Sequence, residues 1–229
     1  MDVPVLLIEF EGVVACTAVA RRAALVESLA VEGIAVDPRM LALAAGHATE
    51  DAVRRVRRAA GAADDETAVD LGRLRAERAF AARAGKGLSL SVDARPALER
   101  LASHCRLALV TRASRREVEF ILDLAGLEGL FRPVIAVEDA TPPKPAPEPW
   151  LVALARVGQL FPGQQLRALA VEDTVVGLRA ARAAGIASVG VGPLPAHEAL
   201  EGDAWVESLL DLTPERVRTL TGVSSGGRR

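Results

Sequence analysis

Five polar residues stand directly after short apolar segments of the sequence. They are Glu9, Glu11, Thr111, Glu172 and Asp173. Carboxylate oxygens are the ligands that magnesium prefers in proteins, and a threonine hydroxyl can donate a hydrogen bond to an anion. Such a set of side chains can hold a metal ion beside an anionic group, provided that the fold brings its members to one edge.

The apolar segments predict strands that are covered on both faces, as in a parallel sheet. These strands are expected at residues 3–8, 107–110, 134–137, 166–171 and 186–191. Helical patterns alternate with them at residues 94–102, 115–124, 147–157 and 175–184. The alternation predicts an α/β fold with a doubly wound, Rossmann-like parallel sheet. Functional groups collect at the carboxyl ends of such strands, so the five polar residues are expected at one rim.

The long stretch after the first strand interrupts this alternation. Its Ala, Leu and Arg residues are spaced as in helices at 18–32, 38–45, 50–60 and 65–84, without a strand signal. We interpret residues 16–87 as an inserted small α-helical cap domain. Residues 1–15 and 88–222 then form the α/β core domain, and residues 223–229 form a flexible tail.

Composition excludes several classes of function. The chain has 229 residues and a formal net charge of −2, so we expect no nucleic-acid partner and no membrane partner. The two cysteines, Cys16 and Cys105, show no zinc-binding spacing, and both are interpreted as small buried side chains. No apolar stretch reaches the roughly 20 residues that span a bilayer, and no signal peptide is visible. A cytoplasmic location is predicted.

Four segments, in order, resemble the haloacid dehalogenase (HAD) superfamily, and within it the capped phosphatases and β-phosphoglucomutase-like proteins. The segments are LLIEFEGVV (6–14), LALVTRAS (107–114), KPAPEPW (144–150) and LAVEDTVVGLRAARAAG (169–185). The resemblance covers about residues 3–215, and the helical insertion falls where this family places its small cap. It implies a Mg²⁺-dependent phosphatase that acts on a small phosphorylated metabolite, as a monomer or weak homodimer.

The resemblance also implies roles by position. Glu9 would attack phosphorus, and Glu11 would serve as general acid and base. Magnesium would be held by Glu9, the Glu11 carbonyl, Glu172 and Asp173. The phosphoryl group would be bound by Thr111, Arg112 and Lys144. Neutralisation of anionic charge by a metal and a lysine is what phosphoryl transfer needs. Taken without the other motifs, Lys144 would instead be interpreted as a surface lysine on a proline-rich loop.

The first motif departs from the family pattern, which reads Asp-x-Asp-Gly where this chain has Glu9 and Glu11. The extra methylene moves each carboxylate by more than ~1 Å, and a misplacement of that size can cost on the order of a hundredfold in rate. Three interpretations stay open: an altered phosphatase, a phosphate- or magnesium-binding pseudoenzyme that acts as a sensor or partner, and a different reaction on a phosphorylated ligand. A metal-free dehalogenase is disfavoured by the acidic pair at 172–173. Both glutamates could also be mere solvated turn residues.

The insertion offers candidates for substrate contact. In the family that the sequence resembles, the loop between the first cap helices faces the active site. In this chain that loop spans residues 45–49. Sugar-phosphate mutases carry a lysine and an arginine in that loop and a histidine near the start of the cap. This chain has Ala45, Thr49 and, nearest to the histidine, Arg21, so a two-phosphate mutase cycle is not expected. His47 either contacts substrate or is a solvated turn residue.

Overall fold

The computed structural model describes residues 2–45, 47–86, 90–91, 93–193 and 201–223. In this part of the chain one parallel sheet has the strand order β3-β2-β1-β4-β5-β6. Its strands are β1 (Val3–Glu9), β2 (Arg106–Val110), β3 (Val134–Ile135), β4 (Leu166–Glu172), β5 (Ala187–Val191) and β6 (Ala204–Val206). The predicted doubly wound α/β fold is confirmed, with β1 in the interior of the sheet.

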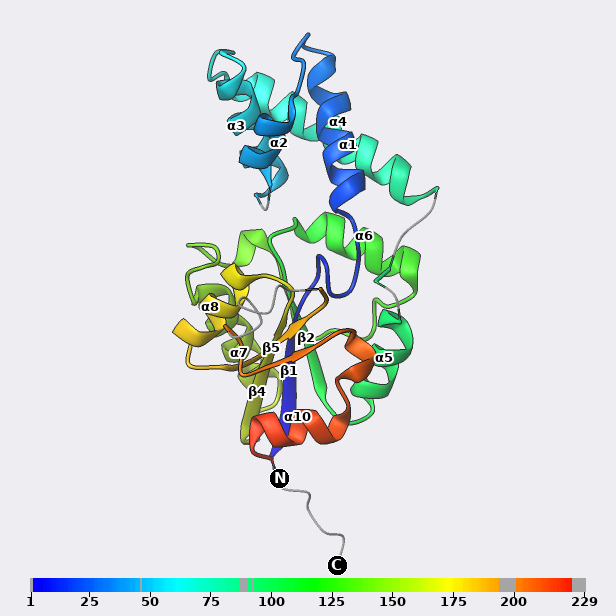
Figure 1. Cartoon of the computed structure of the whole chain (residues 1–229), viewed down its shortest axis with the longest axis vertical. Coiled ribbons are helices and arrows are strands. Elements are labelled where there is room, and N and C mark those ends of the chain that lie inside the picture. The colour runs from blue at the N-terminus through cyan, green and yellow to red at the C-terminus, as the bar shows by residue number, and fades with distance from the viewer. Residues whose placement is uncertain (1, 46, 87–89, 92, 194–200, 224–229) are drawn as a thin grey trace, which may run out of the picture.

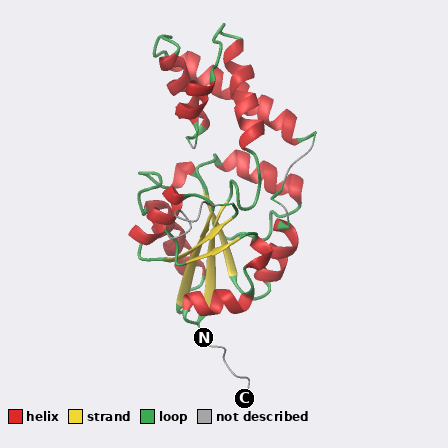
Figure 2. Ribbon diagram, viewed as in Figure 1, coloured by secondary structure: helices red, strands yellow, loops and turns green. Residues whose placement is uncertain are grey.

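Helices cover both faces of this sheet (Figure 2). They are α5 (Ala94–Ala102), α6 (Arg115–Ala125), α7 (Glu148–Leu160), α8 (Val175–Ala183) and α10 (Pro214–Thr221). Leu6 and Ile8 of β1 pack in the apolar cluster that contains α5, α6 and α10, whereas Val5 and Leu7 pack in the cluster with α7 and α8. The split follows from the alternation of side chains along a strand, and it explains why both faces of β1 are apolar.

Several boundaries differ from those expected. The predicted strand at 134–137 is shorter, because β3 ends at Ile135 and a 3₁₀ turn follows at Val137–Asp139. Neither β6 nor α10 was predicted. Cys105 is buried as expected, but Cys16 is exposed because it lies on the surface connection between β1 and the insertion. Most of the expected flexible tail, residues 224–229, lies outside the described residues.

The inserted helices are α1 (Ala18–Ala30), α2 (Pro38–Ala44), α3 (Thr49–Ala59) and α4 (Glu66–Ala84). Figure 1 shows them stacked beyond the carboxyl ends of the strands, with α6 between them and the sheet. They have an apolar cluster of their own, which includes Leu29, Val53 and Val56. This packing accords with a separate cap domain over residues 16–87, a division that stays a prediction. None of the described helices is long and apolar enough to cross a membrane.

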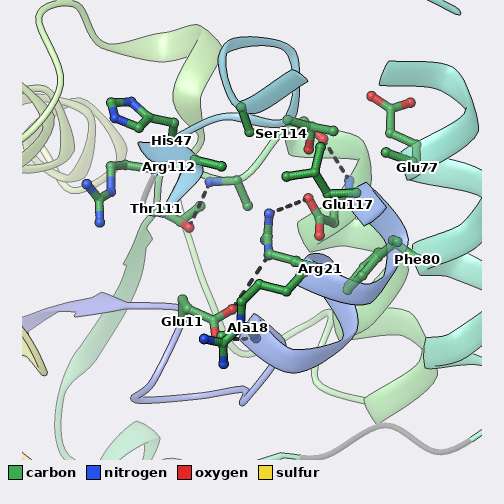
Figure 3. A pocket seen from close by; sticks show the side chains of 18 of the residues that line it. Glu11, Ala18, Arg21, His47, Glu77, Phe80, Thr111, Arg112, Ser114 and Glu117 are labelled. Atoms are coloured by element: carbon green, nitrogen blue, oxygen red, sulfur yellow. Dashed lines mark hydrogen bonds and ion pairs between the residues drawn. The ribbon is translucent and has the colours of Figure 1, made fainter. Parts of the chain in front are cut away.

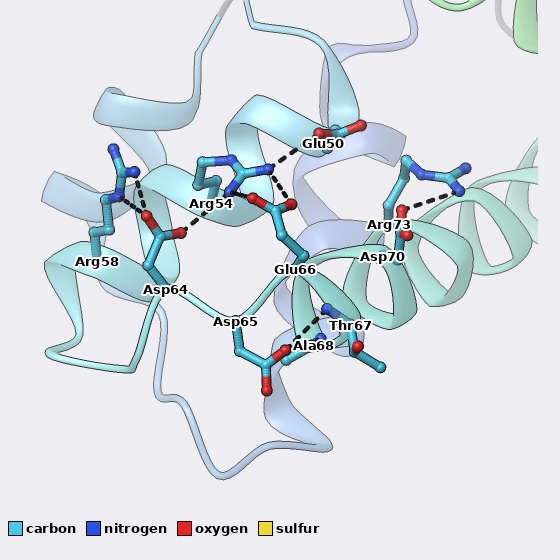
Figure 4. A network of polar contacts seen from close by, with 10 residues as sticks. All are labelled: Glu50, Arg54, Arg58, Asp64, Asp65, Glu66, Thr67, Ala68, Asp70 and Arg73. Carbon is cyan, nitrogen blue, oxygen red and sulfur yellow. Dashed lines mark hydrogen bonds and ion pairs between the residues drawn. The ribbon is translucent and has the colours of Figure 1, made fainter.

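Exposed polar contacts join α3 to the start of α4 (Figure 4). Arg54 lies 3.2 Å from Glu50, 3.1 Å from Asp64 and 2.7 Å from Glu66. The Asp65 carboxylate accepts hydrogen bonds from the Thr67 and Ala68 amides, which caps the first turn of α4. Together these contacts fix the turn that separates the two helices.

The two connections between the insertion and the core lie side by side. Ala15 and Leu90 form an antiparallel bridge, and the Ser91 amide donates to the Val14 carbonyl at 3.0 Å. The Ser91 hydroxyl also donates to the Gly12 carbonyl at 3.3 Å. Both connections are therefore attached to the turn that follows β1.

Candidate active site

The register of the sheet brings the predicted rim residues together. Glu9 lies opposite Val110, so Thr111 follows at the same level, and Ile8 lies opposite Val171, just before Glu172. A cavity of about 540 Å³ opens between this rim and the inserted helices (Figure 3). Its core side is lined by Glu9, Glu11, Thr111, Arg112 and Asp173.

Lys144 is buried behind Glu9, where it contacts two carboxylates. Its Nζ lies 2.8 Å from Glu172 Oε1 and also donates to Glu9 Oε2, and it lies 3.9 Å from the centre of the Trp150 ring. Burial alone would lower the pKa of Lys144, but the attraction of Glu172 and Glu9 outweighs burial and raises it. The ammonium group therefore stays charged and holds both glutamates.

The two glutamates respond differently to this shared lysine. Burial raises the pKa of Glu9, although Lys144 opposes the shift. Burial also acts on Glu172, but Lys144 and hydrogen bonds from Thr174 outweigh it, so that the pKa of Glu172 is lowered. The Thr174 amide and hydroxyl reach Glu172 Oε2 at 2.9 and 2.8 Å. Glu172 is thus a fixed anion, and neither it nor Lys144 is among the described residues that line the cavity.

The Glu9 side chain folds back on its own turn. Its Oε1 accepts from the Phe10 amide at 2.9 Å and from the Glu11 amide at 3.3 Å, while Oε2 accepts from Lys144. The longer glutamate side chain is thereby accommodated with both oxygens hydrogen-bonded at the end of β1.

Glu11 turns toward the insertion. Its Oε1 accepts from the Thr17 and Ala18 amides, each at 2.9 Å, and its Oε2 accepts from the Thr17 hydroxyl. The start of a helix favours a carboxylate at this place because its amides are free and its dipole is positive. The carboxylate predicted as general acid and base is therefore attached to the first turn of α1.

Asp173 packs directly against Gly12. A Cβ at Gly12 would lie 1.8 Å from Asp173 Oδ2, and Gly12 has a positive φ of 81°, so only glycine fits this turn. Burial raises the pKa of Asp173 to about 8, with further contributions from the repulsion of Glu172 and Glu9. The carboxyl groups of Glu9, Glu172 and Asp173 thus lie close together, and Lys144 is the cation that acts on all three.

This excess of carboxylates fits a bound divalent cation, which would stabilise the ionised form of Asp173. Among the described residues, no three His, Cys, Asp or Glu side chains are already grouped as a ligand set. Magnesium, however, is commonly held by one or two carboxylates and keeps several waters. Glu9 and Asp173, which both line the cavity, provide two such carboxylates.

On the insertion side, Arg21 is held by an acid that sequence reasoning missed. Its Nη1 lies 2.9 Å from Glu117 Oε2, its Nε donates to the Thr17 hydroxyl at 2.9 Å, and its guanidinium lies 5.5 Å from the centre of the Phe80 ring (Figure 3). Burial raises the pKa of Glu117, although Arg21 opposes the shift. Glu117 stands four residues before Ile121 on the buried face of α6. This helical spacing from an apolar residue was the sequence signal that Glu117 is buried.

The remaining predicted contacts also reach the cavity. The Thr111 hydroxyl oxygen accepts from the Ala113 amide at 3.1 Å. Arg112 lines the core side, while His47 and Thr49 line the cavity from the insertion. Burial lowers the pKa of His47, and repulsion by Arg55 and Arg112 lowers it further, although Asp51 opposes the shift. His47 is therefore placed where it can contact a ligand.

Comparison with solved structures identifies the same fold elsewhere. CbbY from Rhodobacter sphaeroides, crystallised with phosphate, is 23% identical and superposes with a TM-score of 0.75, which covers 92% of this chain and 96% of that one. β-Phosphoglucomutase from Clostridium difficile is 17% identical, with a TM-score of 0.77, over 97% of this chain and 98% of that one. At these identities the likeness concerns the fold.

Sequence comparison identifies the family. An imidazoleglycerol-phosphate dehydratase from Phytophthora nicotianae is 35% identical over 111 residues, which are 48% of this chain and 22% of that relative. The chain thus matches about a fifth of that longer protein. The family model for haloacid dehalogenase-like hydrolases matches residues 8–185, which include the carboxyl ends of β1, β2 and β4 and every core residue of the site described above. The chain belongs to the haloacid dehalogenase-like hydrolase family.

Proposed function

We propose that the protein is a magnesium-dependent phosphatase that hydrolyses a small phosphate monoester. The observation that carries this proposal is the position of Glu9, whose buried carboxylate contacts Lys144 at the end of β1 and lines the cavity beside Thr111. Family membership supports hydrolysis, and the solved CbbY structure contains phosphate. The partner is accordingly a small phosphorylated metabolite.

In this proposal Glu9 forms a bond to phosphorus while the bond from phosphorus to the alcohol oxygen breaks. Glu11 donates a proton to the departing alkoxide. It then takes a proton from the water that hydrolyses the glutamyl phosphate, which restores Glu9 and releases phosphate. Thr111 and Arg112 hold the phosphoryl oxygens, and Lys144 reduces the repulsion between Glu9 and its anionic substrate.

Magnesium would be held by Glu9, Asp173 and the Glu11 carbonyl, where it supplies neutralisation of the phosphoryl oxygens when bound. We propose that Glu172 acts mainly on Lys144 and not on the metal, because its two oxygens are already hydrogen-bonded to Lys144 and Thr174. It holds Lys144 in place behind Glu9. Direct contact between Glu172 and the metal stays a prediction.

Binding without turnover is the second candidate function. It is favoured by the way in which Glu11 is held, since its carboxylate is saturated by Thr17 and Ala18 at the start of α1. Release of the acid from these partners is then required for each proton transfer. A protein in which Glu11 stays bound would retain phosphate and magnesium without hydrolysis.

The test measures phosphate release from a panel of phosphomonoesters with magnesium, for the wild type, Glu9→Ala and Glu9→Asp. Glu128→Ala, at an exposed site, is the matched control. We expect the wild type and the control to be active and Glu9→Ala to be inactive. An inactive wild type with an active Glu9→Asp variant would support binding without turnover. Absence of both hydrolysis and phosphate binding in the wild type would contradict both functions.

A further inference from the structure

The part of the cavity that lies in the insertion is largely apolar. Its volume of about 540 Å³ is typical of small-molecule sites, and a phosphoryl group at Thr111 would occupy only a small share of it. The walls around the remaining space are formed by Leu25, Leu41, Ala52, Leu74, Phe80 and Phe120. Most of the surface available to a leaving group is therefore hydrocarbon.

Several charged side chains that line the cavity already have polar partners. Arg21 contacts Glu117 at 2.9 Å, and Glu77 contacts Arg73 at 2.9 Å. The Glu11 carboxylate is hydrogen-bonded to the start of α1. A second phosphate or a ring of hydroxyl groups on the ligand would have to compete with these partners. The cost is largest at Glu117, which is the buried member of these contacts.

Three further arginines at the cavity form no ion pair with the residues that the structure describes. Arg22, Arg78 and Arg116 line the cavity, and all three residues are exposed. Exposed charges of one sign around a cleft raise the local concentration of oppositely charged ligands. Their position suits the attraction of an anionic phosphate ester from solvent, whereas the walls behind them suit its carbon skeleton.

We propose that the substrate is a phosphate monoester of a bulky, uncharged, apolar alcohol. This inference rests on the phosphatase function proposed above and specifies the leaving group. Each methylene group buried against the walls strengthens binding by about fourfold. A hydroxyl group buried there without a partner weakens it, so the cavity discriminates against sugar phosphates of the same size.

The test compares two esters that differ in little except hydroxyl groups. Cyclohexylmethyl phosphate and glucose 6-phosphate are both phosphorylated primary alcohols on a six-membered ring, so their leaving groups have similar size. We expect kcat/KM to be at least about tenfold higher for cyclohexylmethyl phosphate, given the cost of unpaired buried hydroxyl groups. Equal values, or a preference for glucose 6-phosphate, would overturn the inference.

A matched pair of variants tests whether the cavity wall causes this preference. Leu74 and Leu71 are both on α4 and are 41% and 45% exposed, but only Leu74 is among the described residues that line the cavity. Leu74→Gln should raise KM for cyclohexylmethyl phosphate several-fold and leave glucose 6-phosphate unaffected or improved. Leu71→Gln should match the wild type. Equal effects of the two substitutions would contradict a role for the wall.

Failure of the phosphatase function would be recognised separately. If no ester is hydrolysed in the presence of magnesium, that function fails, and the affinity of the two esters is then measured by titration calorimetry. Tighter binding of cyclohexylmethyl phosphate would support the apolar ligand class without turnover. Equal binding, or no binding of either ester, would overturn the inference as well.

Discussion

Arg21 of α1 and Glu117 of α6 form an ion pair, with Nη1 2.9 Å from Oε2, that joins the helical insertion to the core. The pair is flanked by the Phe80 ring and by Thr17, which in turn donates to Glu11. One chain of contacts therefore runs from the core helix α6 through the insertion to the turn after β1. Its members come from three separate parts of the sequence.

Removal of the charge at Glu117 tests this connection. Glu117→Gln removes the shorter of the two carboxylate contacts of Arg21, whose Nε also lies 3.7 Å from Glu11 Oε2. We expect the free energy of unfolding at pH 7 to fall by no more than about 1 kcal/mol, because burial of the Glu117 charge offsets much of the ion pair. The control is Glu119→Gln on the same helix, whose contact with Arg115 is 3.7 Å long and exposed. Urea unfolding of both variants measures the difference, and equal stabilities would contradict it.

The pH dependence of the same variant provides an independent check. Burial raises the pKa of Glu117 above its ordinary value of 4.5, so the folded state binds a proton more tightly than the unfolded state does. This contribution to stability is full below pH 4.5 and is lost as the pH rises through the folded-state pKa. The wild type should therefore lose stability relative to Glu117→Gln as the pH rises from 4.5. A constant difference between the two proteins would argue against the raised pKa.

Gly12 is predicted to tolerate no side chain. Gly12→Ala places a Cβ 1.8 Å from Asp173 Oδ2 and also forces alanine into a positive φ, which alone costs roughly 1–2 kcal/mol. Gly163→Ala is the control. Gly163 also has a positive φ, of 77°, but a Cβ there would meet no atom within 4 Å, so this variant measures the backbone cost alone. We expect Gly12→Ala to be the less stable variant in urea unfolding and to lose phosphate release. Equal destabilisation would show that Asp173 moves aside easily.

Lys144 is predicted to stabilise the fold as well as the site. Lys144→Met leaves Glu9 and Glu172 buried without a cation, and removal of one partner from a buried pair costs about 3–5 kcal/mol. The change should be measured by urea unfolding with EDTA present, so that no metal replaces the lost charge. Lys86→Met, at an exposed position, is the control and should leave stability unchanged. A small loss in Lys144→Met would indicate that the glutamates are readily protonated.

The two cysteines are predicted to differ in reactivity. Burial raises the pKa of the Cys105 thiol to about 11, whereas Cys16 is exposed. Because the thiolate is the reacting species, the folded protein at pH 8 should react quickly with a thiol reagent at Cys16 and only slowly at Cys105. Cys16→Ser should abolish the fast phase. A fast reaction that persists in this variant would contradict the burial of Cys105.

The sequence predicted the sheet because buried parallel strands have a continuous apolar pattern that surface elements lack. The rim followed from that sheet, since Glu9 and Glu172 end their strands, Thr111 directly follows its strand, and parallel strands end at one edge. The short strand β6 has only three residues, too few for a period to be visible. The contact between Glu117 and Arg21 depends on the way in which two helices approach each other, and no local pattern specifies that approach.

The bridge between Ala15 and Leu90 means that the inserted helices leave and rejoin the core at adjacent points. A segment whose two ends meet in this way can be exchanged as a module, because a short loop can close the gap without altering the strand order. The substrate-facing half of the cavity could thus diverge among relatives while the strand ends keep their arrangement.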